Sequence, residues 1–172
     1  TTSIHEPTIR LRRPRKEDGA NIWRLIEDCP PLDTNSMYAN LVQCDHFADT
    51  CVLAERAGRP VGWVSGHVIP AEPDSLFVWQ VAVHRSTRGA GLGGRMLRDL
   101  LRRPACAEVS KLKTTITRDN AASWALFARF ADRMGGELAS VPHYREDAHF
   151  DGAHATEHMV TIDFREPLAK AA

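Results

Sequence analysis

The chain has 172 residues, of which 43% are hydrophobic and 26% charged, a balance typical of one globular domain that can bury a core. Its 22 basic residues equal its 22 acidic ones, so no net charge favours nucleic acid or an anionic membrane surface as a partner. The 4 cysteines have no C-x-x-C spacing, and no signal core or membrane-spanning apolar run is present. We therefore expect a cytoplasmic protein without structural disulfides.

The first third of the chain predicts a strand, two helices and a hairpin. Residues 8–13 alternate apolar and basic side chains, as a strand does. A helix is expected from about Glu17, where apolar residues begin to recur with helical spacing. A second, short helix follows, with Asn35 or Ser36 as its N-cap. Residues 50–55 and 60–69 flank the turn "RAGR" and predict a β-hairpin.

The remainder alternates strands and helices less regularly. After a loop at 70–74, the almost wholly apolar run 75–84 predicts a central strand that is covered on both faces. A helix follows a glycine-rich segment, and "KLKTTIT" (111–117) predicts another strand. Asn120 is placed to cap the next helix, and the segments 137–144 and 158–164 predict two last strands around a polar, His-rich loop.

This order of elements predicts an α/β (α+β) fold. We expect a single mixed, mostly antiparallel sheet of about seven strands, flanked by about four helices. The predicted domain spans 8–164, between flexible tails at 1–7 and 165–172.

The glycine-rich segment "RGAGLGG" fits two phosphate-binding patterns. Gly89, Gly91 and Gly94 satisfy G-x-G-x-x-G, the dinucleotide fingerprint, which also requires glycine directly after the first strand and an acidic residue at the end of the next strand. Neither condition is met here, because "HRSTR" precedes the glycines and the next strand reads "KTTIT". The Walker A motif is excluded too, since no Gly-Lys-Ser/Thr follows.

The second pattern is Arg-x-x-Gly-x-Gly, which starts at Arg88. At the beginning of a helix it directs consecutive backbone N–H groups toward a pyrophosphate, and the helix dipole favours the negative charge there. Gly89, Gly91 and Gly93 allow close approach, and Arg88 adds a charge-assisted contact. The sequence therefore predicts a coenzyme A site.

Residues 81–95, with Asn120 downstream, resemble the acetyl-CoA core of the GCN5-related N-acetyltransferases. The resemblance implies that the backbone at Val81 and Val83 pairs with pantetheine, and that Asn120 contacts the same arm. It gives the following expected contacts with acetyl-CoA: Val81, Ala82, Val83, Arg88, Gly89, Ala90, Gly91, Leu92, Gly93, Asn120 and Phe127.

Segments outside this core are more specific. "LDTNSMY", "CDHFADTCVLAE" and "FDGAHATEHM" resemble the L-2,4-diaminobutyrate acetyltransferases of ectoine biosynthesis. This resemblance covers roughly residues 11–164, which is most of the chain. It implies transfer of acetyl from acetyl-CoA to the γ-amine of L-2,4-diaminobutyrate, and a homodimer.

A diamino acid carries two ammonium groups and one carboxylate, so its site needs both acidic groups and donors. We expect substrate contacts from Asp33, Asn35, Tyr38, Trp79, His154 and Glu157. Trp79 shares a strand face with Val81 and Val83, where an aromatic side chain can confine the substrate or face an ammonium. His154 and His158 lie four apart, but without H-E-x-x-H or a helical pattern we predict no metal.

The attacking amine has a pKa near that of lysine, about 10, and must lose a proton before it attacks. His154, Glu157 and Asp33 are the candidate bases, and the sequence leaves the choice between them open. Many members of the superfamily use a tyrosine after the Asn120 position to protonate the leaving thiolate, but this chain has Phe127 and no tyrosine there. Tyr38 is our substitute, which makes Tyr38, His154 and Glu157 the candidate catalytic residues.

Transfer in a ternary complex is expected, because no cysteine has an adjacent Cys-His signature for an acyl-enzyme. The nearest alternative is an acetyltransferase for another small-molecule or peptide amine. A non-catalytic acetyl-CoA-binding module is an alternative of a different class.

Overall fold

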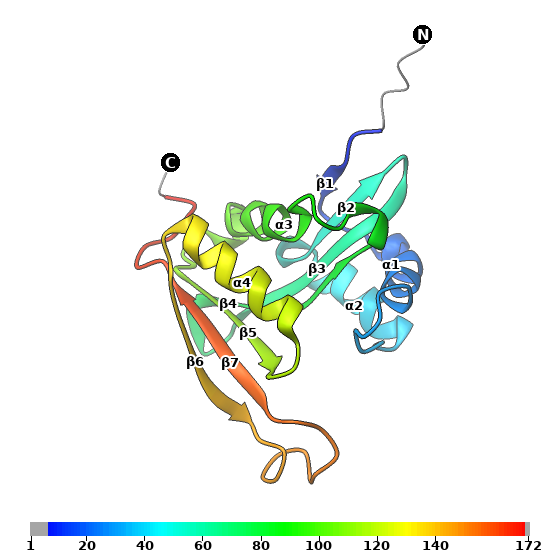
Figure 1. Cartoon of the computed structure of the whole chain (residues 1–172). Coiled ribbons are helices and arrows are strands. Elements are labelled where there is room, and N and C mark those ends of the chain that lie inside the picture. The colour runs from blue at the N-terminus through cyan, green and yellow to red at the C-terminus, as the bar shows by residue number, and fades with distance from the viewer. Residues whose placement is uncertain (1–6, 171–172) are drawn as a thin grey trace. The chain divides into compact units, whose positions relative to one another are not determined.

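The computed structural model describes residues 7–170. The predicted N-terminal tail therefore lies, apart from Pro7, outside the described residues, as do the last two residues of the predicted C-terminal tail. The elements are labelled in Figure 1. The strands are β1 (Arg10–Arg12), β2 (Val52–Arg56), β3 (Arg59–Ile69), β4 (Glu72–Val83), β5 (Lys111–Thr117), β6 (Glu137–Tyr144) and β7 (Glu157–Asp163). The α-helices are α1 (Gly19–Glu27), α2 (Met37–His46), α3 (Leu92–Leu101) and α4 (Ala121–Met134).

The strands form a seven-stranded sheet in the order β1-β2-β3-β4-β5-β7-β6. The β4–β5 pair is parallel, whereas the β1–β2, β2–β3, β5–β7 and β6–β7 pairs are antiparallel. The predicted mixed, mostly antiparallel sheet with four helices is thus confirmed. The chain divides into two compact units, described separately below: residues up to Ser65 with Gln80–Leu100, and Gly66–Trp79 with the residues from Leu101 onward.

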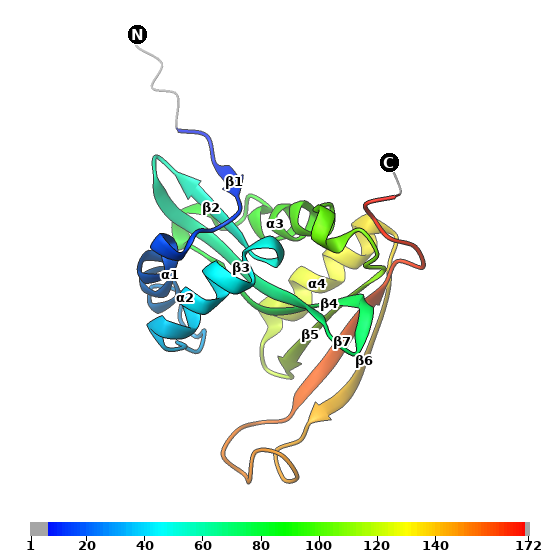
Figure 2. The ribbon, with the colours of Figure 1, turned by 180° about the vertical axis from the view of Figure 1, so that it is seen from behind.

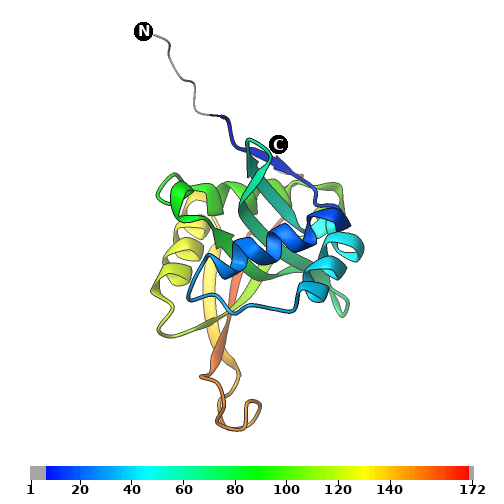
Figure 3. The same ribbon diagram turned by 90° about the vertical axis from the view of Figure 1, so that its right-hand side faces the viewer.

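The first unit packs helices on both faces of its strands. Residues from α1, including Ile22 and Ile26, form a buried cluster with Leu53 and Trp63 of β2 and β3. The neighbouring Gly62 points to the other face, because side chains alternate along a strand, and there it meets Met96 of α3. Figure 3 shows α1 and α3 on opposite sides of these strands. Ile22, Leu25 and Ile26 of α1 and Met96, Leu97 and Leu100 of α3 are all buried.

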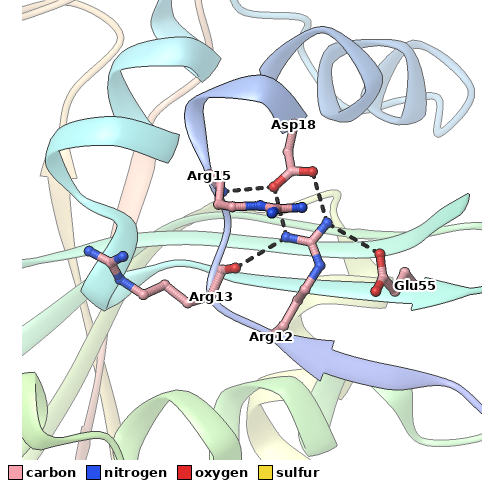
Figure 4. Close-up of polar contacts among 5 residues, drawn as sticks. All are labelled: Arg12, Arg13, Arg15, Asp18 and Glu55. Carbon is pink, nitrogen blue, oxygen red and sulfur yellow. Dashed lines mark hydrogen bonds and ion pairs between the residues drawn. The ribbon is translucent and has the colours of Figure 1, made fainter. Parts of the chain in front are cut away.

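A charged network ties β1 to the start of α1 (Figure 4). Both terminal nitrogens of Arg12 donate to the Asp18 carboxylate at 2.8 Å, and Nη2 also lies 3.2 Å from Oε2 of Glu55. The backbone N–H of Arg15 donates to the same carboxylate at 2.7 Å. The hydrogen bonds from Arg12 hold the pKa of Asp18 below its ordinary value, although partial burial opposes the shift.

We expect Asp18→Asn to lower the free energy of unfolding at pH 7 by about 1–2 kcal/mol, because the bidentate pair is lost. A depressed carboxyl pKa contributes stability above the unfolded value of about 3.9, and this contribution disappears as the pH falls through the lower folded value. The difference from wild type, measured by urea denaturation, should therefore shrink at acid pH. Asp28→Asn, which changes an exposed carboxylate at the end of α1, is the control. A difference that stays constant down to acid pH would contradict this assignment.

The second unit is built on β5, β7 and β6. The register pairs Lys111 with Asp163 and Thr117 with Glu157, so β5 and β7 run together over their full length. Buried residues of β5 and β7, such as Leu112 and Ile162, lie on one face. The loop that connects β6 to β7 extends beyond the paired part of these two strands (Figures 1 and 2).

Several sequence predictions are corrected in detail. The predicted loop at 70–74 is only a turn at residues 70 and 71, because β4 already begins at Glu72. The expected cover on both faces of β4 is wrong, since residue 79 is exposed and residues 77, 81 and 83 are only half-buried. Ser36, not Asn35, caps α2, because its hydroxyl accepts the Ala39 N–H at 3.1 Å. Glu157 is the first residue of β7 and not a loop residue.

Candidate functional site

The glycine segment forms an exposed loop that leads directly into α3. After β4 the chain makes one turn of 3-10 helix at Arg85–Thr87, and α3 begins at Leu92. Gly89 and Gly91 have φ values of 81° and 74°, which residues with a side chain rarely adopt. Apart from the glycine itself and its two chain neighbours, no atom of residues 7–170 lies within 4 Å of where a Cβ would stand on either glycine, so the loop leaves room for a ligand against its backbone. These two features are ones that a phosphate-binding loop needs, and the binding itself stays a prediction.

Two side chains converge on the carbonyl of Val83 below this loop. Nε of Arg88 donates to the Val83 carbonyl oxygen at 3.2 Å, and the Cys29 thiol lies 3.6 Å from the same atom. Burial raises the pKa of Cys29, and the nearby Arg88 only partly opposes this shift. The thiol therefore stays protonated and does not supply a nucleophile.

Two other cysteines are also kept as thiols. Burial raises the pKa of Cys44 to about 12 and that of Cys106 to about 11. Because the thiolate is the nucleophilic form, these groups are inert at neutral pH. This agrees with the expectation that acetyl is not carried on a cysteine.

In the first unit, two side chains hold the segment that carries Asp33 and Asn35 by its backbone. Nε2 of Gln80 donates to the Asp33 carbonyl at 2.7 Å, and Nε1 of Trp23 donates to the Asn35 carbonyl at 2.8 Å. The Asp33 side chain is exposed. Tyr38, in the first turn of α2, is 74% exposed. Both side chains are thus accessible to a small molecule.

We expect Ser36→Ala to destabilise the protein by about 1 kcal/mol, since the Ala39 N–H loses its acceptor at the start of α2. Thermal and urea unfolding would measure the loss. Thr34→Ala, two residues earlier in the exposed connection, is the control and should change stability by less. Equal effects of the two changes would mean that the cap contributes nothing.

The second unit contains the remaining candidates for coenzyme and substrate binding. Trp79 is 53% exposed, which is unusual for so large an apolar ring on a central strand. The Asn120 side chain accepts the Ser123 N–H at 3.2 Å and caps α4. Phe127, the residue that replaces the expected tyrosine, is buried. The cap and a ligand contact are compatible roles for Asn120.

His154 and Glu157 lie side by side. Nε2 of His154 is 3.9 Å from Oε1 of Glu157. Nδ1 of His154 lies 2.7 Å from the Ala155 carbonyl, and because a carbonyl only accepts, Nδ1 carries the proton. With Nδ1 as the donor, Nε2 is the ring nitrogen that lies near Glu157. A ring oriented in this way can accept a proton.

The structure groups the predicted residues by unit. The first unit holds the glycine loop and the residues Asp33, Asn35 and Tyr38, and the second holds Trp79, Asn120, Phe127, His154 and Glu157. Sequence analysis missed the residues that position these groups, namely Gln80 and Trp23. A lone glutamine inside the apolar run "FVWQVAV" was the signal for the first, whereas Trp23 gave none.

Two searches of the described residues gave negative results. Within residues 7–170, no group of three or more His, Cys, Asp and Glu side chains is arranged to hold a metal ion. Across the same residues, no helix has both the length and the apolar character needed to cross a membrane.

The fold and the glycine loop agree with a comparison against known families. The model of the acetyltransferase (GNAT) family matches residues 20–131, which include the cradle and most of α4. The chain belongs to the acetyltransferase (GNAT) family. Its seven-stranded mixed sheet with four helices is the GNAT fold.

Within the GNAT family, the chain is similar to named enzymes along most of its length. It is 47% identical to the L-2,4-diaminobutyric acid acetyltransferase of Methylotuvimicrobium alcaliphilum over 91% of each chain. It is 46% identical to the enzyme of the same name from Vibrio cholerae, over 92% of this chain and 93% of the relative. A solved structure, diaminobutyrate acetyltransferase EctA from Paenibacillus lautus in complex with L-2,4-diaminobutyric acid and coenzyme A, has a TM-score of 0.86. That protein is 37% identical, over 91% of this chain and 95% of its own.

Proposed function

We propose that this chain transfers acetyl from acetyl-CoA to the γ-amine of L-2,4-diaminobutyrate and releases N-γ-acetyl-L-2,4-diaminobutyrate and coenzyme A. The observation that carries the proposal is the 46–47% identity to diaminobutyrate acetyltransferases over more than nine-tenths of the chain. The likeness to a solved relative bound to this amino acid and to coenzyme A supports it.

The first unit supplies the groups for the coenzyme. The backbone N–H groups of the loop and of the first turn of α3 are the donors for the pyrophosphate, with Gly89 and Gly91 allowing its close approach. Arg88, whose Nε is fixed on the Val83 carbonyl, keeps its charge beside them. The backbone N–H near Val83 is the expected donor to the thioester oxygen as negative charge grows on it.

His154 is the general base that deprotonates the attacking γ-amine. Its Nδ1 is bonded to the Ala155 carbonyl, so Nε2 is the ring nitrogen that takes the proton, and Oε1 of Glu157 lies 3.9 Å from it. The carboxylate of Asp33 then serves to hold the α-ammonium, which selects the γ-amine for attack. The leaving thiolate takes a proton from Tyr38, whose hydroxyl is exposed on α2.

We expect Tyr38→Phe to lower kcat by about 10²-fold or more while leaving the KM for acetyl-CoA unchanged, because general-acid help is removed and binding is not. Steady-state thiol release measures both constants. Tyr144→Phe, at an exposed tyrosine of β6, is the matched control. Full turnover by Tyr38→Phe would exclude this residue as the acid.

The function is tested by measuring thiol release from acetyl-CoA with L-2,4-diaminobutyrate, ornithine, lysine, spermidine and a peptide. Preference for diaminobutyrate, with acetyl found on the γ-nitrogen by NMR, is the expected result. Preference for another amine would leave the family unchanged but refute the substrate. Coenzyme binding without thiol release from any amine would favour the non-catalytic module.

The proposal extends to the setting of the reaction. We infer a homodimer that acts in the cytoplasm, in ectoine biosynthesis and thus in protection against osmotic stress. Supporting the dimer, β6 is the last strand of the sheet, and its Val141 and Tyr144 side chains are 59% and 44% exposed. Sedimentation equilibrium of the purified protein would reveal the oligomeric state.

A further inference from the structure

The second unit contains a cavity that none of the proposed catalytic residues lines. It has a volume of about 680 Å³, within the range of small-molecule sites. It lies between the β5–α4 connection and the β6–β7 hairpin. Its lining consists of Arg118, Asp119, Pro142, Arg145, Glu146, Ala155, Thr156 and His158.

The cavity lies on the opposite face of β7 from Glu157. Successive side chains of a strand point to opposite faces, so His158 points away from the side where Glu157 lies. The ring of Trp124, on α4, packs edge-on against the His158 ring at a centroid distance of 6.4 Å. The cavity is therefore on the α4 side of the sheet and is separate from the His154–Glu157 pair.

A buried polar group lines this cavity. His158 is only 8% exposed, and its Nε2 lies 3.4 Å from Nε of Arg118. Because arginine only donates, Nε2 accepts and the ring proton lies on Nδ1. Nδ1 is buried and has no hydrogen-bond partner in the described part of the chain. An unpaired buried N–H is unfavourable, and such groups in native proteins commonly mark a site for a ligand or a water.

The guanidinium group of Arg118 has a hydrogen-bond partner at its Nε and, within residues 7–170, none at its two terminal nitrogens. Its Nε is occupied by His158, whereas its two terminal nitrogens bond to no residue between 7 and 170. A guanidinium fixed in this way presents a planar pair of donors, which matches a carboxylate better than it matches a single point charge.

The lining carries both signs of charge. Arg145 adds a second cation, which lies 3.3 Å from Asp147, while Asp119 and Glu146 add two carboxylates. Oδ1 of Asp119 accepts the Thr117 hydroxyl at 2.7 Å, so this carboxylate is held in place. A simple anion would be repelled by the acids, whereas a ligand with a carboxylate and an ammonium close together satisfies both.

We propose that this cavity binds an α-amino acid zwitterion, with Arg118 receiving the carboxylate and Asp119 and Glu146 facing the ammonium. The site is distinct from that of acetyl transfer, and the proposal does not depend on which amine is acetylated. Arg118 lies two residues before Asn120, the cap of α4, so the ligand would sit beside the start of that helix.

The test uses L-2-aminobutyrate, an α-amino acid that lacks the γ-amine, as the probe. Its binding to the full-length protein is followed by NMR of the indole N–H groups of the four tryptophans. Trp124→Phe and Trp79→Phe identify the signals of Trp124, beside the cavity, and of Trp79, outside it. We expect the Trp124 signal to shift with increasing probe, and Arg118→Gln to weaken the Kd at least about 10-fold.

Arg129→Gln, at an exposed arginine of α4 away from the cavity lining, is the matched control and should leave the Kd unchanged. Sodium acetate and n-propylamine carry one charge each and should both bind more weakly than the probe. The proposal fails if the shift is confined to Trp79, if Arg118→Gln binds as well as Arg129→Gln, or if acetate binds as tightly as L-2-aminobutyrate.

Discussion

Gly91→Ala is expected to raise the KM for acetyl-CoA roughly 100-fold, because two charge-assisted hydrogen bonds to the pyrophosphate are lost or displaced. Gly91 has a φ of 74°, and an alanine there either strains the loop or moves its N–H groups out of position. The methyl group would also occupy the open space above the backbone where the ligand approaches. Steady-state kinetics and direct titration with coenzyme A measure the effect.

Gly58→Ala is the control for backbone strain. Gly58 also has a φ of 74° and open space around its Cβ position, but it lies in the β2–β3 turn. Both changes should destabilise the fold by about 1–2 kcal/mol, and only Gly91→Ala should weaken coenzyme binding. If the two variants bind coenzyme A equally well, the glycine loop is not the phosphate cradle.

Glu157→Gln is expected to lower kcat/KM for L-2,4-diaminobutyrate about 100-fold, because a carboxylate that meets a positive charge in a partly buried setting is replaced by a neutral amide. The side chain is only 20% exposed, and its Oε1 lies 3.9 Å from Nε2 of His154. In the proposed mechanism, the proton that His154 takes from the amine loses the carboxylate beside it. The KM for acetyl-CoA should not change, since the cradle is untouched.

Glu137→Gln tests whether any loss of negative charge in this part of the sheet has the same result. Glu137 begins β6 and is highly exposed, with only a distant pair to Arg165 at 3.9 Å. An exposed pair of this kind contributes little, so its kinetics should match wild type. An equal fall in kcat/KM for both variants would argue against a specific role of Glu157.

The helices and most of the strands could be predicted because each depends on a local pattern. The alternation of "KLKTTIT" gave β5 with its observed bounds, Lys111–Thr117. Asn120 was predicted as the cap of α4, and its side chain accepts the Ser123 N–H, while Gly135 ends the helix in the left-handed conformation. The glycine loop could be recognised for the same reason, because Arg88 and its glycines are close together in the chain, and its role in binding coenzyme A stays a prediction.

The positions of the substrate candidates depend on contacts that no local pattern encodes. Gln80 reaches the Asp33 carbonyl across 47 positions of sequence, and Arg118 reaches His158 across 40. A lone polar residue in a strand signals that a partner exists but does not identify it. The exposure of Trp79 was likewise hidden, because an apolar run does not reveal which face of its strand stays open.

The hydrogen bonds from Gln80 and Trp23 hold the segment that carries Asp33 and Asn35 by its carbonyl oxygens. Every amino acid supplies the same carbonyl, so the path of this segment is independent of the side chains that it displays. Positions 33 and 35 can therefore be randomised in a library while the loop keeps its course. Because the backbone is held independently of these side chains, a few substitutions at positions 33 and 35 could be selected for activity on diamines of other lengths.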